Sequence, residues 1–97
     1  MKVIIGPAAL SELQAAADYY VLHAGTNVAR DFVDEFERVV KFIATSPQLG
    51  AIFRGNRLRY FLRKFPYSVI YQASHDELRV LALSHHRRRP NYWAKRK

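Results

Sequence analysis

The stretch between Thr26 and Pro47 carries the strongest periodic pattern in the sequence, and it limits the chain to folds that cover one side of a long helix. Apolar residues recur every three or four positions, as on the buried stripe of an amphipathic α-helix, and charged residues fill the positions between them. The apolar set is Ala29, Phe32, Val33, Phe36, Val39, Val40 and Ile43. We predict that Thr26 caps this helix and that Pro47, which restricts Ser46, ends it. Its inward aromatic rings are expected to belong to a core, not to a cofactor site.

A weaker helical pattern precedes this one. Gly6 and Pro7 favour a helix start, because proline suits the first helical turn, and Gly25 favours the helix end. The residues expected to face inward are Leu10, Leu13, Ala17, Tyr20 and Val21. Since only a few residues separate the two helices, we expect an antiparallel helix hairpin. Before it, residues 2–5 predict a short strand, buried on both faces because its apolar residues are consecutive.

Three segments with strand-like patterns follow the helices. Residues 57–62 alternate in polarity, which predicts a half-buried strand. Its buried face would carry Leu58, Tyr60 and Leu62, and its other face Arg57, Arg59, Phe61 and, beyond it, Arg63. Residues 67–71 and 78–84 are rich in β-forming side chains and predict two more strands. Residues 48–56 show no periodicity, and we expect a loop there.

The predicted order of elements is therefore β-α-α-β-β-β, an α+β arrangement. Strands joined by short turns pair antiparallel, so the last three are expected to form a meander that the helix hairpin covers on one face. The N-terminal strand should add to this sheet, beside a neighbour that the pattern does not define. The opposite face is expected to be exposed, with its arginines open to solvent. At 97 residues, the chain is expected to be one domain, residues 1–97.

The charge of the chain is unevenly distributed. The formal net charge is +8 at pH 7, yet the first 48 residues hold four basic and six acidic side chains, and the rest hold twelve basic and two acidic ones. A basic half beside a slightly acidic half favours a polyanionic partner, either nucleic acid or an acidic protein. The chain has no cysteine, which excludes disulfides and thiolate metal sites and fits a reducing cytoplasm. We expect no signal peptide and no membrane span, because no apolar run is long enough.

The last strand leads into a compact block of polar and aromatic side chains. These are His85, His86, Arg87, Arg88, Arg89, Tyr92 and Trp93. The block favours phosphate binding or phosphate chemistry, because histidine moves protons near neutral pH and arginine binds phosphate through paired hydrogen bonds. The alternative is a solvated run of charge.

Strand geometry limits the chemistry that this block can carry out. Adjacent residues of a strand point to opposite faces, so His85 and His86 cannot bind one metal ion, and we expect no metal site and no cofactor. One of the two histidines is expected to be structural and to hydrogen-bond the turn. Tyr92 and Trp93 either pack the tail on the sheet or stack on a base.

Several segments, in their order along the chain, resemble the RelE/ParE superfamily of toxins from type II toxin–antitoxin modules, a group with plasmid-stabilisation members. They are residues 47–50, residues 65–71, and residues 81–90 followed by Tyr92 and Trp93. The resemblance covers nearly the whole chain. It implies a cytoplasmic bacterial toxin that a small cognate antitoxin, expected to be acidic, neutralises. RelE-like toxins cleave mRNA on the ribosome, and ParE-like toxins poison DNA gyrase.

The first hypothesis from this resemblance is ribosome-dependent mRNA cleavage by an endoribonuclease that uses no metal. Its catalytic residues would be His85, His86, Arg87, Arg88 and Tyr92, and its substrate-binding residues Arg57, Arg59, Phe61, Arg63, Lys64 and Trp93. Tyr92 falls where RelE-like nucleases carry a functional tyrosine. Two positions depart from the nuclease pattern, since Ser68 stands where an arginine is common and Phe61 where a lysine often helps.

Two other hypotheses remain open: a gyrase poison, and a binding module of toxin fold without catalytic activity. The missing arginine at Ser68 motivates the gyrase poison, whereas the basic sheet face motivates the nuclease. We expect the side chains of Arg57, Arg87 and Tyr92 to lie together against one anionic surface.

Overall fold

The computed structural model describes all 97 residues and contains two helices, one short 3-10 helix and five strands. In chain order they are β1 (Lys2–Ile5), α1 (Pro7–Ala24), α2 (Thr26–Thr45), η1 (Pro47–Leu49), β2 (Ala51–Arg54), β3 (Arg57–Phe61), β4 (Tyr67–Ala73) and β5 (Glu77–His85). The strands form one sheet in the order β1-β5-β4-β3-β2. Strands β2 to β5 pair antiparallel, and β1 pairs parallel with β5. The predicted α+β class is confirmed, with one strand more than expected.

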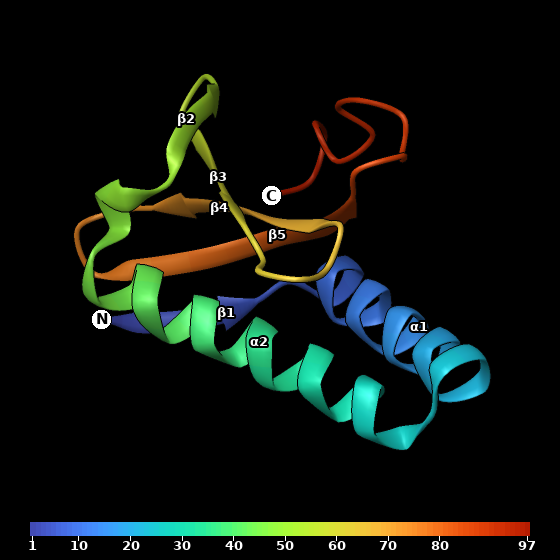
Figure 1. The fold of residues 1–97 in the computed structure, drawn as a ribbon. Coiled ribbons are helices and arrows are strands. Elements are labelled where there is room, and N and C mark those ends of the chain that lie inside the picture. Colours follow the sequence, from blue (N-terminus) through green and yellow to red (C-terminus); the bar gives the residue numbers. More distant parts are fainter.

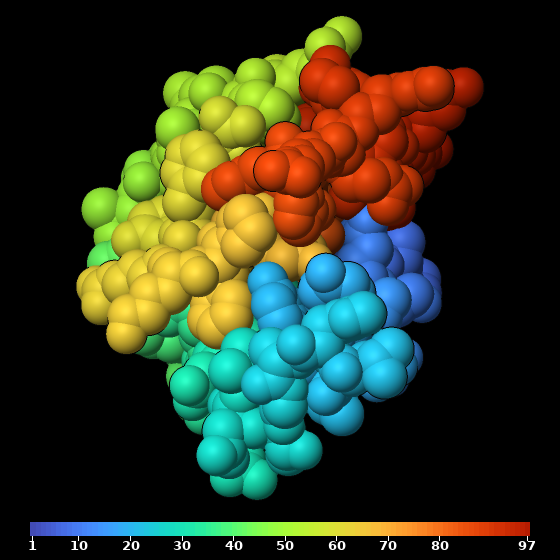
Figure 2. All heavy atoms as spheres, turned by 45° about the vertical axis from the view of Figure 1, so that its right-hand side comes forward, coloured from blue at the N-terminus to red at the C-terminus, as the bar shows by residue number.

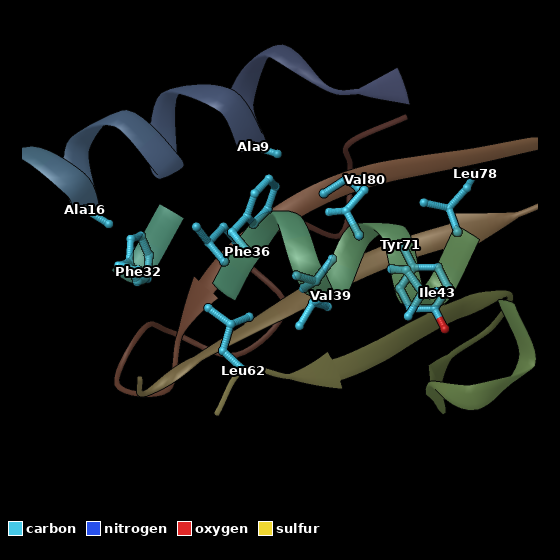
Figure 3. Packing of buried hydrophobic residues seen from close by; sticks show 13 residues of the cluster. Ala9, Ala16, Phe32, Phe36, Val39, Ile43, Leu62, Tyr71, Leu78 and Val80 are labelled. Atoms are coloured by element: carbon cyan, nitrogen blue, oxygen red, sulfur yellow. The ribbon is translucent and has the colours of Figure 1, made fainter. Parts of the chain in front are cut away.

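The helix hairpin packs on one face of the sheet (Figure 1). All the inward residues predicted for α2 are buried except Val33, which is partly buried. Figure 3 shows α2 side chains such as Phe32 and Ile43 in the space between α1 and the sheet. The ring of Phe32 lies 5.0 Å from that of Tyr20 and 5.1 Å from that of Phe65, so aromatic pairs close one end of this core. Neither helix combines the length and apolar character needed to cross a membrane.

The stripe predicted for α1 is partly wrong. Leu13 and Tyr20 face the core, but the buried positions beside them are Ala9 and Ala16 (Figure 3), while Leu10 and Val21 are exposed. Alanine lets a helix approach its neighbour closely, and apolar side chains on two adjacent stripes cannot be ranked by spacing alone. The predicted cap by Thr26 is also wrong. Gly25 holds the N-cap position with φ 96°, and no side chain caps the helix.

Two predictions about the sheet edges are wrong as well. Strand β1 lies at one edge, and its first two residues are exposed, so it is not buried on both faces. Residues 51–54, expected to be a loop, form strand β2 at the other edge. A two-residue turn joins β2 to β3, and Gly55 adopts φ 60° there, a conformation that favours glycine. Strand β2 is short and Ile52 is 82% exposed, so no alternating pattern marks it in the sequence.

The second face of the sheet is covered rather than exposed. After β5 ends at His85, the chain turns back and residues 86–97 lie across this face (Figure 1). Trp93 is 2% exposed and packs on Ile70 of β4 and Ala82 of β5, with Phe53 beside it. These side chains point away from the helices and need an apolar cover of their own, which the tail supplies. Of the two alternatives left open for Trp93, the structure shows the packing of the tail on the sheet.

Candidate functional site: a cationic cleft under the tail

A cleft of about 290 Å³ lies between the sheet and the C-terminal tail. Strands β2 to β5 contribute Phe53, Arg59, Ser68, Ile70, Ser84 and His85, and the tail contributes His86, Arg88, Arg89, Pro90, Asn91 and Trp93. In Figure 2 the C-terminal residues stand out as a raised mass that borders the residues around the β3–β4 turn. The cleft therefore depends on both the parity of the strands and the path of the tail.

The cations of the cleft have no acidic partners. Arg59, Arg88 and Arg89 line it, no aspartate or glutamate does, and none of the three takes part in an ion pair. The guanidinium of Arg59 lies 4.0 Å from the ring centre of Phe53 and 4.8 Å from that of Phe61. Its Nε is buried and has no hydrogen-bond partner. An anion is the ligand that this arrangement favours.

Ser68 and His86 form the polar floor of the cleft. Ser68 is 1% exposed because β4 turns this side chain away from the helices, and its Oγ lies 3.2 Å from Nε2 of His86. The imidazole of His86 meets the ring of Phe61 edge-on at 5.2 Å. The Phe61 side chain is 50% exposed and lies beside Arg59 and His86, although it does not itself line the cleft. The serine that departs from the nuclease pattern is thus a partner of a candidate histidine.

His85 points to the other face, as the alternation of a strand requires. Its ring packs edge-on against Tyr67 at 4.9 Å, and its Nδ1 accepts a hydrogen bond from the backbone N–H of Arg87 at 3.0 Å. Burial lowers the pKa of His85, and the neighbouring charges of His86 and Arg87 lower it further. The imidazole is therefore neutral at pH 7. His85 is the structural histidine of the pair, hydrogen-bonded to the turn as predicted.

Tyr92 belongs to a clamp that ties the tail to helix α1. Its hydroxyl donates to Oε2 of Glu12 at 2.5 Å, and Arg96 donates to Oε1 of the same carboxylate at 2.7 Å. Glu12 also accepts the backbone N–H of Leu83 at 3.1 Å. Burial, reinforced by the hydrogen bond to Glu12, raises the pKa of Tyr92 to about 12. The guanidinium of Arg88 covers the phenol ring at 4.0 Å.

The remaining predicted residues lie outside the cleft. Arg57 donates to the carbonyl of Arg96 at 2.9 Å and lies over Trp93, and the backbone N–H of Arg63 binds Glu35. Lys64 is exposed in the β3–β4 turn, with φ 65°.

Arg87 is exposed at the turn after β5, outside the cleft. The expectation that Arg57, Arg87 and Tyr92 meet at one surface stays a prediction: Arg57 and Tyr92 have different hydrogen-bond partners, the Arg96 carbonyl and Glu12, but both lie against Arg96.

The cleft still gathers part of the predicted set and adds residues that were not predicted. From that set it contains Arg59, His85, His86, Arg88 and Trp93, with Phe61 at its border. It also contains Arg89 of the predicted phosphate-binding block, and the additions are Phe53, Ser68, Ile70, Ser84, Pro90 and Asn91. Strand parity places Ser68 and Ser84 on the side of Ile70 and Ala82, a signal present in the sequence. No such signal marks Phe53 or Asn91, which lie in a short edge strand and in the tail. No group of three possible metal ligands occurs anywhere in the molecule.

Comparison with known proteins adds to this geometry. Residues 3–90 match the family described as the ParE toxin of type II toxin–antitoxin system, parDE. A solved structure described as the chromosomal ParDE TA system from P. aeruginosa superposes with a TM-score of 0.77, covering 88% of this chain and 95% of that chain at 22% sequence identity. At that identity the superposition establishes the shared fold alone. A comparison with curated protein sequences gives no significant match.

Proposed function

The chain belongs to the family of ParE toxins of type II toxin–antitoxin systems, and from that premise we propose that it stops bacterial growth by poisoning DNA gyrase until a cognate acidic antitoxin neutralises it. The family match carries this proposal, because among the related toxins the ParE-like members are those expected to act on gyrase. Such a toxin works in the cytoplasm, where its target lies.

The geometry of the cleft weakens the case for mRNA cleavage, so the family match decides between the two targets. Metal-independent RNA cleavage needs a base near the 2′-hydroxyl, an acid near the leaving oxygen, and cations around the phosphate. The phenol of Tyr92 donates to Glu12 outside the cleft, and its pKa of about 12 makes it a poor proton donor at neutral pH. His85 has Nδ1 engaged by the turn and a lowered pKa. One histidine, His86, is left for two proton transfers.

Ribosome-dependent mRNA cleavage is the second candidate, and one observation favours it. Arg59, Arg88 and Arg89 share the cleft with the hydrogen-bonded pair Ser68 and His86, so cations and a proton-transfer group do meet there. A nuclease of this kind would use His86 alternately as base and acid, with the arginines holding the phosphate. The residues Arg57, Arg63, Lys64 and Arg87 would then contribute long-range attraction rather than contacts to the reacting phosphate.

Purified protein separates the two targets. Incubation with gyrase, ATP and plasmid, followed by detergent and protease, should release linear plasmid that is absent when the toxin is omitted or premixed with the product of the neighbouring antitoxin gene. In cells, transcript 5′ ends should keep their positions after induction. Normal supercoiling without linear plasmid would contradict gyrase as the target. New 5′ ends within codons, lost in His86→Ala, would establish the nuclease instead.

The antitoxin proposal has its own test. The second half of the chain holds twelve basic and two acidic side chains, which matches an acidic partner segment. A partner that binds only the folded toxin stabilises it by mass action, by about 2.7 kcal/mol at a hundredfold excess over Kd. We therefore expect the melting temperature to rise with the concentration of the neighbouring gene product and to fall back toward that of the free toxin at high salt. An unchanged melting temperature would refute the pairing.

A further inference from the structure

We propose that the cleft under the tail binds single-stranded nucleic acid, with a backbone phosphate among Arg59, Arg88 and Arg89 and the adjoining base stacked on Phe61. This goes beyond gyrase poisoning, which requires only that the toxin contact the enzyme. It assigns a ligand class to a cleft that the family match leaves without one.

The charge of the cleft selects an anion. Three guanidinium groups line it without a carboxylate, whereas the ion pairs of the molecule lie elsewhere, at Glu12, Glu35 and Glu77. The walls include apolar groups such as Ile70 and Trp93, both nearly inaccessible to solvent. Cations beside such walls are less screened than cations on an open surface, so their attraction for an anion is stronger.

The state of Arg59 points to a phosphate oxygen. Two aromatic rings hold its guanidinium in place, at 4.0 Å from Phe53 and 4.8 Å from Phe61. A fixed planar fork of N–H donors matches the paired oxygens of a phosphate, and a flexible lysine does not. Its buried Nε has no acceptor within the protein. The Nε of Arg57, outside the cleft, is also buried without a partner, so the phosphate contact would fall on the terminal N–H groups of Arg59.

The ring of Phe61 and the size of the cleft point to a nucleotide unit of a strand. A volume of about 290 Å³ is at the lower end for small-molecule sites, so it suits a phosphate and sugar with the base outside. Phe61 is 50% exposed next to Arg59, where that base would lie.

A duplex does not satisfy both contacts at once. In a double helix the face of each base is covered by its neighbours, so a base can stack on Phe61 only after leaving the stack. Basic grooves that carry an exposed aromatic ring bind single strands in this way, with little sequence preference. The ligand class is therefore a single strand of DNA or RNA, and the experiment distinguishes the two.

The test uses the full-length protein and oligonucleotides labelled with fluorescein at the 5′ end. Oligothymidylate and oligouridylate of about 12 nucleotides, and a duplex of the same length, are titrated by fluorescence anisotropy at several salt concentrations. We expect both single strands to bind more tightly than the duplex. Phe61→Leu should weaken binding roughly 5- to 140-fold, the range for one stacked base. Arg59→Gln should make the slope of log K against log salt shallower by about 0.7.

Arg30→Gln is the matched control, because it removes one positive charge from the exposed surface of α2. It should leave both the affinity and the salt slope unchanged. Arg89→Gln gives an exposed second test within the cleft, should Arg59→Gln lower the melting temperature. The inference is overturned if no oligonucleotide binds at low salt, if the duplex binds more tightly, or if Arg30→Gln weakens binding as much as the cleft variants do.

The outcome also separates this inference from the gyrase proposal. Gyrase poisoning by a protein that binds neither single strand would refute the cleft assignment alone. Binding that strongly prefers the ribose strand would support the cleft assignment and identify its ligand as RNA, which the 2′-hydroxyl distinguishes from DNA, while the gyrase proposal depends on its own plasmid assay.

Discussion

The hydrogen bond between Tyr92 and Glu12 should make the stability of the protein depend on pH in the alkaline range. Burial, followed by the bond to Glu12, raises the pKa of Tyr92 from 10.0 to about 12 in the folded state. Between these two values the unfolded chain releases the phenol proton and the folded chain keeps it. The unfolded state then binds fewer protons, so the free energy of unfolding decreases as the pH rises. The contribution is complete below pH 10 and is lost as the pH passes 12.

The size of this effect follows from the shift in pKa. One pKa unit corresponds to 1.36 kcal/mol, so a shift of two units sets an upper limit of about 2.7 kcal/mol. Tyr92 is only half-buried, and solvent screening reduces the limit to about 1–1.5 kcal/mol. Tyr92→Phe keeps the ring and removes the hydroxyl. At pH 8 it should cost about 1.5 kcal/mol, the lower range for a hydrogen bond to a charged acceptor.

Urea unfolding at intervals from pH 8 to pH 12 measures both quantities. The difference between wild type and Tyr92→Phe should shrink by about 1–1.5 kcal/mol over this range. Tyr20, Tyr67 and Tyr71 also have raised pKa values, but they occur in both proteins and cancel in the difference. Tyr19→Phe is the matched control, since Tyr19 is 57% exposed, and it should leave stability unchanged. A constant difference between wild type and Tyr92→Phe from pH 8 to pH 12 would refute the reasoning.

Three further predictions concern packing and charge. Gly50→Ala should lower the free energy of unfolding by about 1–3 kcal/mol, because the added Cβ would lie 2.2 Å from the Tyr71 hydroxyl oxygen. Urea unfolding would show this loss, and an unchanged free energy would contradict the contact. Trp93→Ala should lower the free energy of unfolding by about 3 kcal/mol, which unfolding followed by circular dichroism would measure. It should also weaken oligothymidylate binding although it removes no cation, as anisotropy would show. Hydrogen bonding from Arg38 lowers the pKa of Glu35. As the pH falls below 4.5, the free energy of unfolding should therefore decrease more steeply in wild type than in Glu35→Gln. Equal slopes in acid titrations of the two proteins would exclude this pair as a cause.

The fold could be predicted from the sequence where one face of an element is uniformly apolar. Helix α2 meets this condition, since its buried face repeats from Ala29 to Ile43 and no competing stripe exists. Helix α1 does not, because Leu10 and Val21 form an apolar line beside the alanines that are buried. Strand β2 left no pattern, because an edge strand of four residues with Ile52 in solvent has no buried face to mark it.

The site was harder to predict because the tail has no regular structure. Strand parity predicted that Arg59 and Phe61 lie on the face opposite the helix hairpin, and the run of arginines predicted an anion site. What no periodicity encodes is the path after His85, where turns and the left-handed conformation of Asn91, with φ 63°, bring the chain back over the sheet. The contact of Tyr92 with Glu12 joins residues 80 positions apart, beyond any local rule.

The tail therefore creates the site that its own sequence only suggests. Arg88 and Arg89 are exposed on a segment without helix or strand, and such side chains would be free to point anywhere. Trp93 fixes that segment to the sheet, and the clamp at Glu12 fixes it to α1, so the two arginines line the same cleft as Arg59. Burial of the Tyr92 phenol, followed by its bond to Glu12, raises its pKa, and the same bond holds the tail on α1. Loss of that bond would free the tail and with it the cation arrangement that any phosphate ligand needs.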